Sequence, residues 1–146
     1  MDEAVMNKLI GIPFVNGGRD VATGVDCWGL VMHVYGLYDV GLPDFTVDAF
    51  AYQAIDALAG DSIVSRCWHP VLSIHTAKPP VVALMRIHHR WTNHAGVYVG
   101  DNTVLHTTEK TGVVRSKLAN DRQLCFGRGL IDITGFYQYD NDNQCA

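Results

Sequence analysis

The pattern of apolar residues changes halfway along the 146 residues of this chain, and this change constrains the fold more than any other feature. Apolar residues in the first half recur with helical spacing, whereas those in the second half alternate with polar ones. The helical spacing predicts helices over Glu3–Ile10, Cys27–Tyr38 and Asp48–Ala59, and Asp61 with Ser62 can cap a short helix leading toward Trp68. The alternation predicts strands over Val81–Ile87, His94–Val99, Thr103–Thr108, Val113–Arg115 and Ile131–Tyr139.

Helices followed by a run of strands are typical of an α+β domain and not of a βαβ repeat. We therefore expect N-terminal helices packed on an antiparallel β-sheet meander. The length suits a single domain with a proper hydrophobic core, which we place at residues 1–139. Residues 140–146 are polar and are expected to form a C-terminal tail.

The charge and hydropathy of the chain exclude several classes of partner. The net charge is −4, and lysine and arginine are scattered along the sequence, so neither nucleic acid nor an anionic membrane is an expected partner. No apolar run approaches the roughly 20 residues of a membrane span. The first residues, Met1–Lys8, lack the basic and then apolar order of a secretory signal, so we expect synthesis in the cytosol.

The four cysteines are Cys27, Cys67, Cys125 and Cys145, with no close pair among them. Their spacing argues against a zinc ribbon, which needs paired ligands. Without a secretion signal, a disulfide framework is not expected either. We expect Cys67 and Cys125 to be small buried residues, and Cys145 lies in the tail.

Cys27 is the candidate nucleophile. A turn-forming stretch ending in Asp26, the expected N-cap, gives way at Cys27 to an apolar, helix-compatible run. A free thiol titrates at about 8.5, so a nucleophile at neutral pH needs help to ionise. The unpaired N–H groups at a helix start and a nearby imidazole both favour a thiolate, and this chemistry needs no cofactor.

His94 and His106 are the candidate partners of Cys27. A three-residue loop over 100–102 would pair Gly96 with His106 and put both histidines on one face, about 7–8 Å apart at the backbone. A two-residue loop would put them on opposite faces. We predict the odd-numbered loop, with a positive φ at one of its ends, so that His106 orients His94. The absent side chain of Gly96 leaves room for the two imidazoles to meet.

Each of these residues also has a simpler interpretation. A cysteine at a helix start is commonly a packed small residue, and a histidine in a strand is commonly structural. His88 and His89 together with His94 could suggest a metal, but adjacent strand residues point to opposite faces. We therefore predict no metal site.

Two stretches resemble a known family. Phe14–Gly18 and Gly24–Val31 resemble the nucleophile region of the NlpC-type cysteine peptidases, which are papain-like cell-wall hydrolases, and Asn93–Gly100 resembles their histidine strand. His106 falls where their third polar residue is expected.

Further residues resemble one branch of this family. The Asp-Cys-Trp-Gly-Leu order at Cys27, with Leu42–Asp44 after the helix and Gly135–Tyr137 near the end, is similar to the phage tail-assembly branch. The resemblance covers roughly residues 10–139 and implies the papain-like NlpC-type fold.

The resemblance also implies a function, namely hydrolysis of amide bonds in peptidoglycan stem peptides. Cys27 would be the nucleophile, His94 the base and then acid, and His106 the orienting residue. Substrate-binding or oxyanion positions would be Asp26, Phe14 (where the family often has Tyr) and Trp28. The implied partners are the stem peptide and phage tail-tip proteins, with synthesis in the host cytoplasm and a possible place in the virion tail. The alternative is a non-catalytic structural component of a phage tail tip.

Overall fold

The computed structural model describes residues 1–44, 67–87 and 94–140. Its described helices are α1 (Glu3–Leu9) and α2 (Cys27–Leu37), close to the predicted bounds. The predicted helix over Asp48–Ala59 lies outside the described residues, as do Asp61 and Ser62. The described strands are β1 (Arg19–Asp20), β2 (Gly24–Val25), β3 (Trp68–Pro70), β4 (Val81–Arg86), β5 (His94–Tyr98), β6 (Thr103–Thr108), β7 (Gly112–Asn120), β8 (Gln123–Phe126) and β9 (Gly129–Tyr139).

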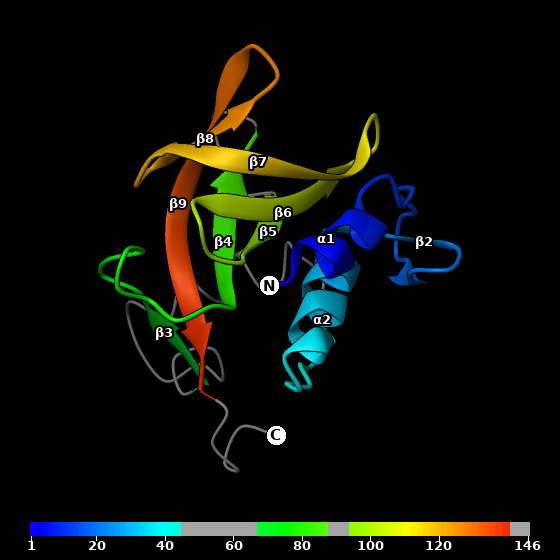
Figure 1. The fold of residues 1–146 in the computed structure, drawn as a ribbon, viewed down its shortest axis with the longest axis horizontal. Helices are drawn as coiled ribbons and strands as arrows, with labels where there is room; N and C mark the ends of the chain where they lie inside the picture. The colour runs from blue at the N-terminus through cyan, green and yellow to red at the C-terminus, as the bar shows by residue number, and fades with distance from the viewer. Residues whose placement is uncertain (45–66, 88–93, 141–146) are drawn as a thin grey trace.

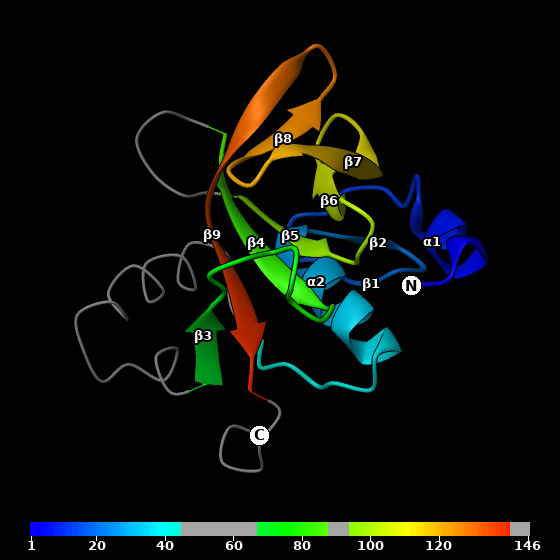
Figure 2. The ribbon, with the colours of Figure 1, turned by 60° about the vertical axis from the view of Figure 1, so that its left-hand side comes forward.

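The larger of the described sheets has seven antiparallel strands in the order β3-β9-β4-β5-β6-β7-β8. Strand β9 also pairs with β8, so that six of these strands close into a barrel-like ring. Both helices lie on one side of this ring (Figures 1 and 2). The predicted α+β class, with helices packed on an antiparallel sheet, is therefore confirmed. None of the helices in the described ranges is long and apolar enough to cross a membrane.

The pleat of the strands divides the buried residues into two clusters. Ala95 and Val97 of β5 face α2 and join the helix-side cluster, whose members include Trp28, Leu30 and Val34. Tyr98 and its neighbours on the other face join the cluster inside the ring, which includes Val81, Ala83, Val104, Leu124 and Phe136. Alternate strand residues thus line two different cores.

The hairpin between β5 and β6 has the predicted three-residue loop. Gly96 pairs with His106, and the N–H of Val99 donates to the carbonyl of Thr103 over 3.0 Å. All three loop residues have positive φ, namely 95° at Gly100, 51° at Asp101 and 57° at Asn102. The prediction that His94 and His106 share one face of the sheet is confirmed, because the odd loop preserves the alternation.

The strands of the second hairpin were only partly predicted. Strand β7 extends beyond the predicted Val113–Arg115, and β8 was not predicted at all. Polar side chains alternate with half-buried ones along β7 and weaken the apolar pattern that identifies a strand.

Two expectations about cysteines are wrong. Cys125 is free and exposed, because alternation along β8 turns Leu124 into the ring and its neighbour outward. Cys67 is buried, but it is disulfide-bonded. The expectation of no disulfide depended on the cellular compartment, which does not determine the thiols that the fold brings together. Cys145 lies outside the described residues.

Candidate active site

Cys27 is the first residue of helix α2, and Asp26 is its N-cap as predicted. The N–H of Gly29 donates to Asp26 Oδ1 over 2.8 Å, and the N–H of Leu30 donates to the Asp26 carbonyl over 3.0 Å. The first bond satisfies an amide group that a helix start leaves unpaired, and the second is the first hydrogen bond within the helix. They also fix the backbone on which the thiol is carried.

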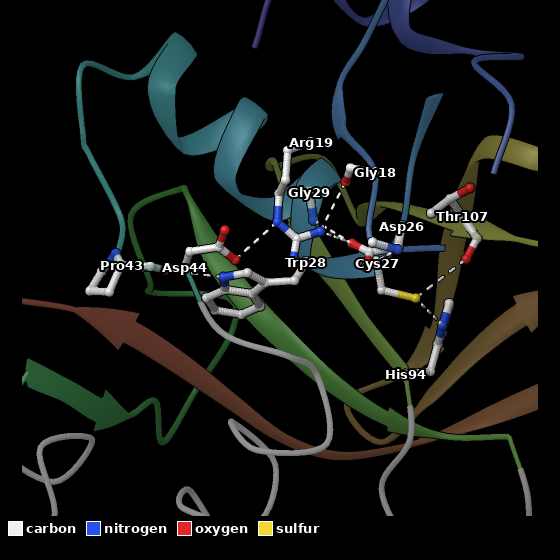
Figure 3. A network of polar contacts seen from close by, with 11 residues as sticks. Gly18, Arg19, Asp26, Cys27, Trp28, Gly29, Pro43, Asp44, His94 and Thr107 are labelled. Carbon is white, nitrogen blue, oxygen red and sulfur yellow. Dashed lines mark hydrogen bonds and ion pairs between the residues drawn. The ribbon is translucent and has the colours of Figure 1, made fainter. Parts of the chain in front are cut away.

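The same carboxylate ties the helix to the glycine-rich loop before it. Gly17 N–H donates to Asp26 Oδ2 over 3.1 Å. Arg19 Nη1 donates to Asp26 Oδ1 over 2.5 Å and to the Gly18 carbonyl over 2.9 Å, while its Nε donates to Asp44 Oδ1 over 3.0 Å (Figure 3). Both Asp26 oxygens therefore hold protein groups, and the structure gives Asp26 the position of a residue that orients Cys27.

Glycine at two positions lets the loop and the helix touch. A Cβ on Gly29 would lie 2.1 Å from the Gly18 carbonyl oxygen, and one on Gly18 would lie 2.4 Å from the carbonyl oxygen of Gly24. No side chain fits at such distances. The glycines in the motif around Cys27 thus have a packing reason for being there.

The thiol of Cys27 lies against the sheet. Its Sγ is 3.2 Å from His94 Nδ1 and 3.6 Å from the carbonyl oxygen of Thr107 (Figure 3). Cys27 is 9% exposed and His94 is 2% exposed. The predicted nucleophile and base are brought into hydrogen-bonding distance in a nearly dry site.

His106 continues the chain of contacts from His94. His94 Nε2 is 3.0 Å from His106 Nδ1, and the two rings meet edge to face with their centroids 5.2 Å apart. A Cβ on Gly96 would lie 3.0 Å from His106 Cβ. The absence of a side chain at Gly96 thus permits the close approach of β5 and β6 that carries the two histidines.

Ser116 is a further member of this series of polar contacts, and it was not predicted from the sequence. Its Oγ is 2.8 Å from His106 Nε2, and the ring of Phe126 packs beside His106 at 5.3 Å between centroids. Ser116 pairs with Val104 on β6, which places it on the same face as His106. The predicted strand ended at Arg115, one residue too early to reveal this relation.

Burial keeps both histidines neutral in the resting site. Removal from water, and to a smaller extent the neighbouring His106, lowers the pKa of His94 from 6.5 to about 3. Burial likewise lowers the pKa of His106 to about 4. A neutral imidazole has one donor and one acceptor nitrogen, so each histidine can pass a hydrogen bond from one neighbour to the next.

Trp28 and Phe14 are the remaining two predicted site residues. Trp28 is fully buried, and its Nε1–H donates to the Pro43 carbonyl over 3.1 Å. It packs on Trp68 at 6.1 Å between ring centroids, so its ring is part of the hydrophobic core. Phe14 is half-buried and forms a parallel bridge with Val25. Within the described ranges no group of His, Cys, Asp and Glu could hold a metal ion.

Comparison with known proteins gives one family and one fold. Residues 11–124 match the model of the NlpC/P60 family. No curated protein sequence matches the chain. The structure resembles NlpC2 from Trichomonas vaginalis, with a TM-score of 0.61, 15% identity, and coverage of 93% of this chain and 45% of that one.

Two further solved structures are similar. NlpC1 from Trichomonas vaginalis has a TM-score of 0.61 and 14% identity, with coverage of 93% of this chain and 42% of that one. A Staphylococcus aureus protein described as similar to lipoprotein, NLP/P60 family, has a TM-score of 0.56 and 18% identity, with 97% and 43% coverage. The chain spans less than half the length of these three proteins. At such identities, the likeness shows a shared fold.

Proposed function

Because this chain belongs to the NlpC/P60 family, as its motifs indicated, we propose that it is a cysteine peptidase that hydrolyses amide bonds in peptidoglycan stem peptides. The observation that carries the proposal is the distance of 3.2 Å between Cys27 Sγ and His94 Nδ1. The family is one of cell-wall cysteine peptidases, and this geometry supplies the thiol and base that the reaction needs.

Attack begins with the proton of the thiol. His94 Nδ1 takes this proton, and the thiolate of Cys27 then bonds to the carbonyl carbon of the substrate, which gives a tetrahedral intermediate with a negatively charged oxygen. The thiolate and the imidazolium form together, so the attraction between the two charges offsets part of the free-energy cost of burying them. We assign stabilisation of the oxyanion to the backbone N–H of Cys27, where the dipole of α2 also favours negative charge.

The intermediate then collapses. His94 Nδ1 returns its proton to the leaving amine, the C–N bond breaks, and an acyl group remains on Cys27 as a thioester. A water molecule loses its proton to His94 and attacks the thioester carbonyl. The C–S bond breaks, the carboxylic acid leaves, and the proton returns from His94 to the thiolate of Cys27.

His106 has an orienting role in this scheme. Its Nδ1 accepts the Nε2–H of His94, which leaves His94 Nδ1 facing the thiol. The role is the one that the third residue of a catalytic triad has toward its histidine. Since His106 is fully buried, no water competes for this bond.

Cleavage of defined fragments tests the proposal. Purified protein, a Cys27→Ala variant and a Cys125→Ser variant are incubated with peptidoglycan fragments, and the products are followed by mass spectrometry. We expect stem-peptide cleavage by the wild type and by Cys125→Ser, because Cys125 is exposed on β8 and outside the site. Cleavage should vanish in Cys27→Ala.

Two results would contradict the proposal. One is cleavage that persists in Cys27→Ala, and the other is a folded wild-type protein that leaves every fragment intact. The second result would favour the non-catalytic tail-tip component. Association with a phage tail stays a prediction from the motifs, and co-purification with tail proteins is its test.

A further inference from the structure

The site contains a continuous chain of polar contacts from the nucleophile to β7. It runs from Cys27 Sγ to His94 (3.2 Å), from His94 to His106 (3.0 Å) and from His106 Nε2 to Ser116 Oγ (2.8 Å). Each histidine contacts one neighbour in this series through each of its two ring nitrogens. The direction of every hydrogen bond therefore depends on its neighbours.

The direction is forced once the thiol has lost its proton. An imidazolium at His94 donates from both nitrogens, so His106 must accept at Nδ1. A neutral His106 then carries its own hydrogen on Nε2, which points at Ser116 Oγ. A hydroxyl oxygen can accept this hydrogen bond, whereas an alkyl side chain cannot.

We propose that Ser116 is a positioning residue, which accepts the Nε2–H of His106 and thereby stabilises the state in which Cys27 is a thiolate and His94 an imidazolium. This deepens the proposed function, but its test requires no substrate. Ser116 acts through the two histidines and touches neither the thiol nor the reacting bond.

The surroundings of His106 make the hydroxyl necessary. His106 is fully buried, and Phe126 packs against its ring. Without Ser116 Oγ, its Nε2–H would be left in a largely apolar environment, and a buried unsatisfied donor is costly. His106 would then favour a hydrogen on Nδ1. That hydrogen would point at His94 Nε2 and oppose the imidazolium.

Among the described residues, the charged groups near the site offer no substitute for the Ser116 hydroxyl. Of the described elements packed around it, the start of α2 contributes Asp26, which is paired with Arg19 of β1. On β7, Lys117 Nζ donates to the Asp101 carbonyl and to Thr103 Oγ1. The side chain of Lys117 leaves the strand on the opposite face from Ser116.

The strand partners of the two histidines carry no charge. His94 pairs with Met85 on β4, and His106 pairs with Gly96 on β5 and Val114 on β7, while Phe126 packs on the ring of His106.

Alkylation of Cys27 measures the thiolate directly. Ser116→Ala and Ser116→Thr are made in a Cys125→Ser background, so that the other free cysteine of the described residues does not react. Iodoacetamide labelling of the Cys27 peptide is followed by mass spectrometry from pH 5 to pH 9. We expect Ser116→Ala to move the rate profile about one unit to higher pH and to lower the rate about tenfold at its acid end. Ser116→Thr keeps a hydroxyl and should restore the profile.

Lys117→Gln is the matched control, because it removes a charge from the same strand on the other face; its profile should coincide with the parent. Superimposable profiles for Ser116→Ala and the parent would overturn the proposal, as would a shift of equal size in Lys117→Gln.

A second measurement uses the wild type alone and does not depend on whether a variant folds. Nitrogen-15 NMR of the wild type should show His106 protonated at Nε2 at the pH where alkylation is fast, and protonation at Nδ1 alone would also overturn it.

The two proposals can fail separately. A shifted profile in a protein that cleaves no peptidoglycan would support the role of Ser116 and reject the peptidase. Cleavage of peptidoglycan together with an unshifted profile would support the peptidase and reject the role of Ser116.

Discussion

Adding one methyl group at Gly96 should damage both stability and the alignment of the histidines. The new Cβ would lie 2.7 Å from the Leu105 carbonyl oxygen and 3.0 Å from both His106 Cβ and Met85 Cε. Met85 can move its flexible end, but the backbone of β6 cannot yield as easily. The contact with Leu105 must open by about 0.7 Å to reach 3.4 Å, where ordinary contacts begin. Gly96 pairs with His106, so this displacement moves the His106 ring away from His94.

We expect Gly96→Ala to lower the free energy of unfolding by about 1–3 kcal/mol, as overpacking does. Because a misplacement of about 1 Å can cost about 100-fold in rate, the alkylation rate of Cys27 at pH 7 should fall about 10- to 100-fold. Urea denaturation and iodoacetamide labelling measure the two effects. Gly129→Ala is the matched control, since its Cβ would meet only the Phe126 carbonyl oxygen at 3.8 Å. Equal stability and equal reactivity in the two variants would refute the reasoning.

Three further predictions concern the site. Burial lowers the pKa values of His94 and His106 from 6.5 to about 3 and about 4. The unfolded chain therefore takes up protons first, and the free energy of unfolding should fall as pH drops from about 6.5 toward 4. Thermal melts measure this, and a His94→Asn/His106→Asn double variant should show a flatter dependence; an equally steep one would contradict us. Asp26→Ala should lose about 1–2 kcal/mol in urea unfolding because the N-cap disappears, and Asp26→Asn should lose less; an equal loss would argue against capping. Trp28→Phe should lower stability by about 1 kcal/mol through its missing hydrogen bond, with KM for a stem peptide unchanged, and a raised KM would return Trp28 to substrate contact.

The parts of the site that were predictable from the sequence depend on local rules. Asp26 before an apolar run marks a helix start, so the backbone position of Cys27 followed from neighbouring residues alone. The shared face of His94 and His106 followed from the parity of one short loop, because strand side chains alternate strictly. Residues 12 apart could thus be placed together without knowledge of the rest of the fold.

The sequence pattern was less informative about the role of a motif residue that can either pack in the fold or take part in the site. Trp28 stands in the motif around Cys27, and its place there suggested contact with substrate. Its side chain fills the core against Trp68, and contact with a substrate stays a prediction. Asp26 likewise binds Arg19 and Gly17. A motif shows which residues occur together, and it does not show which way each side chain points.

The sequence by itself determined the α+β class, the helix that carries Cys27 and the common face of the two histidines, because each rests on periodicity or on a short turn. Only the tertiary structure decided that His94 meets Cys27, 67 residues away, and that Ser116 stands behind His106. Those contacts depend on how α2 packs on the sheet and on how β9 closes the ring. Such long-range packing is the sum of many weak contacts, and no local pattern in the sequence encodes it.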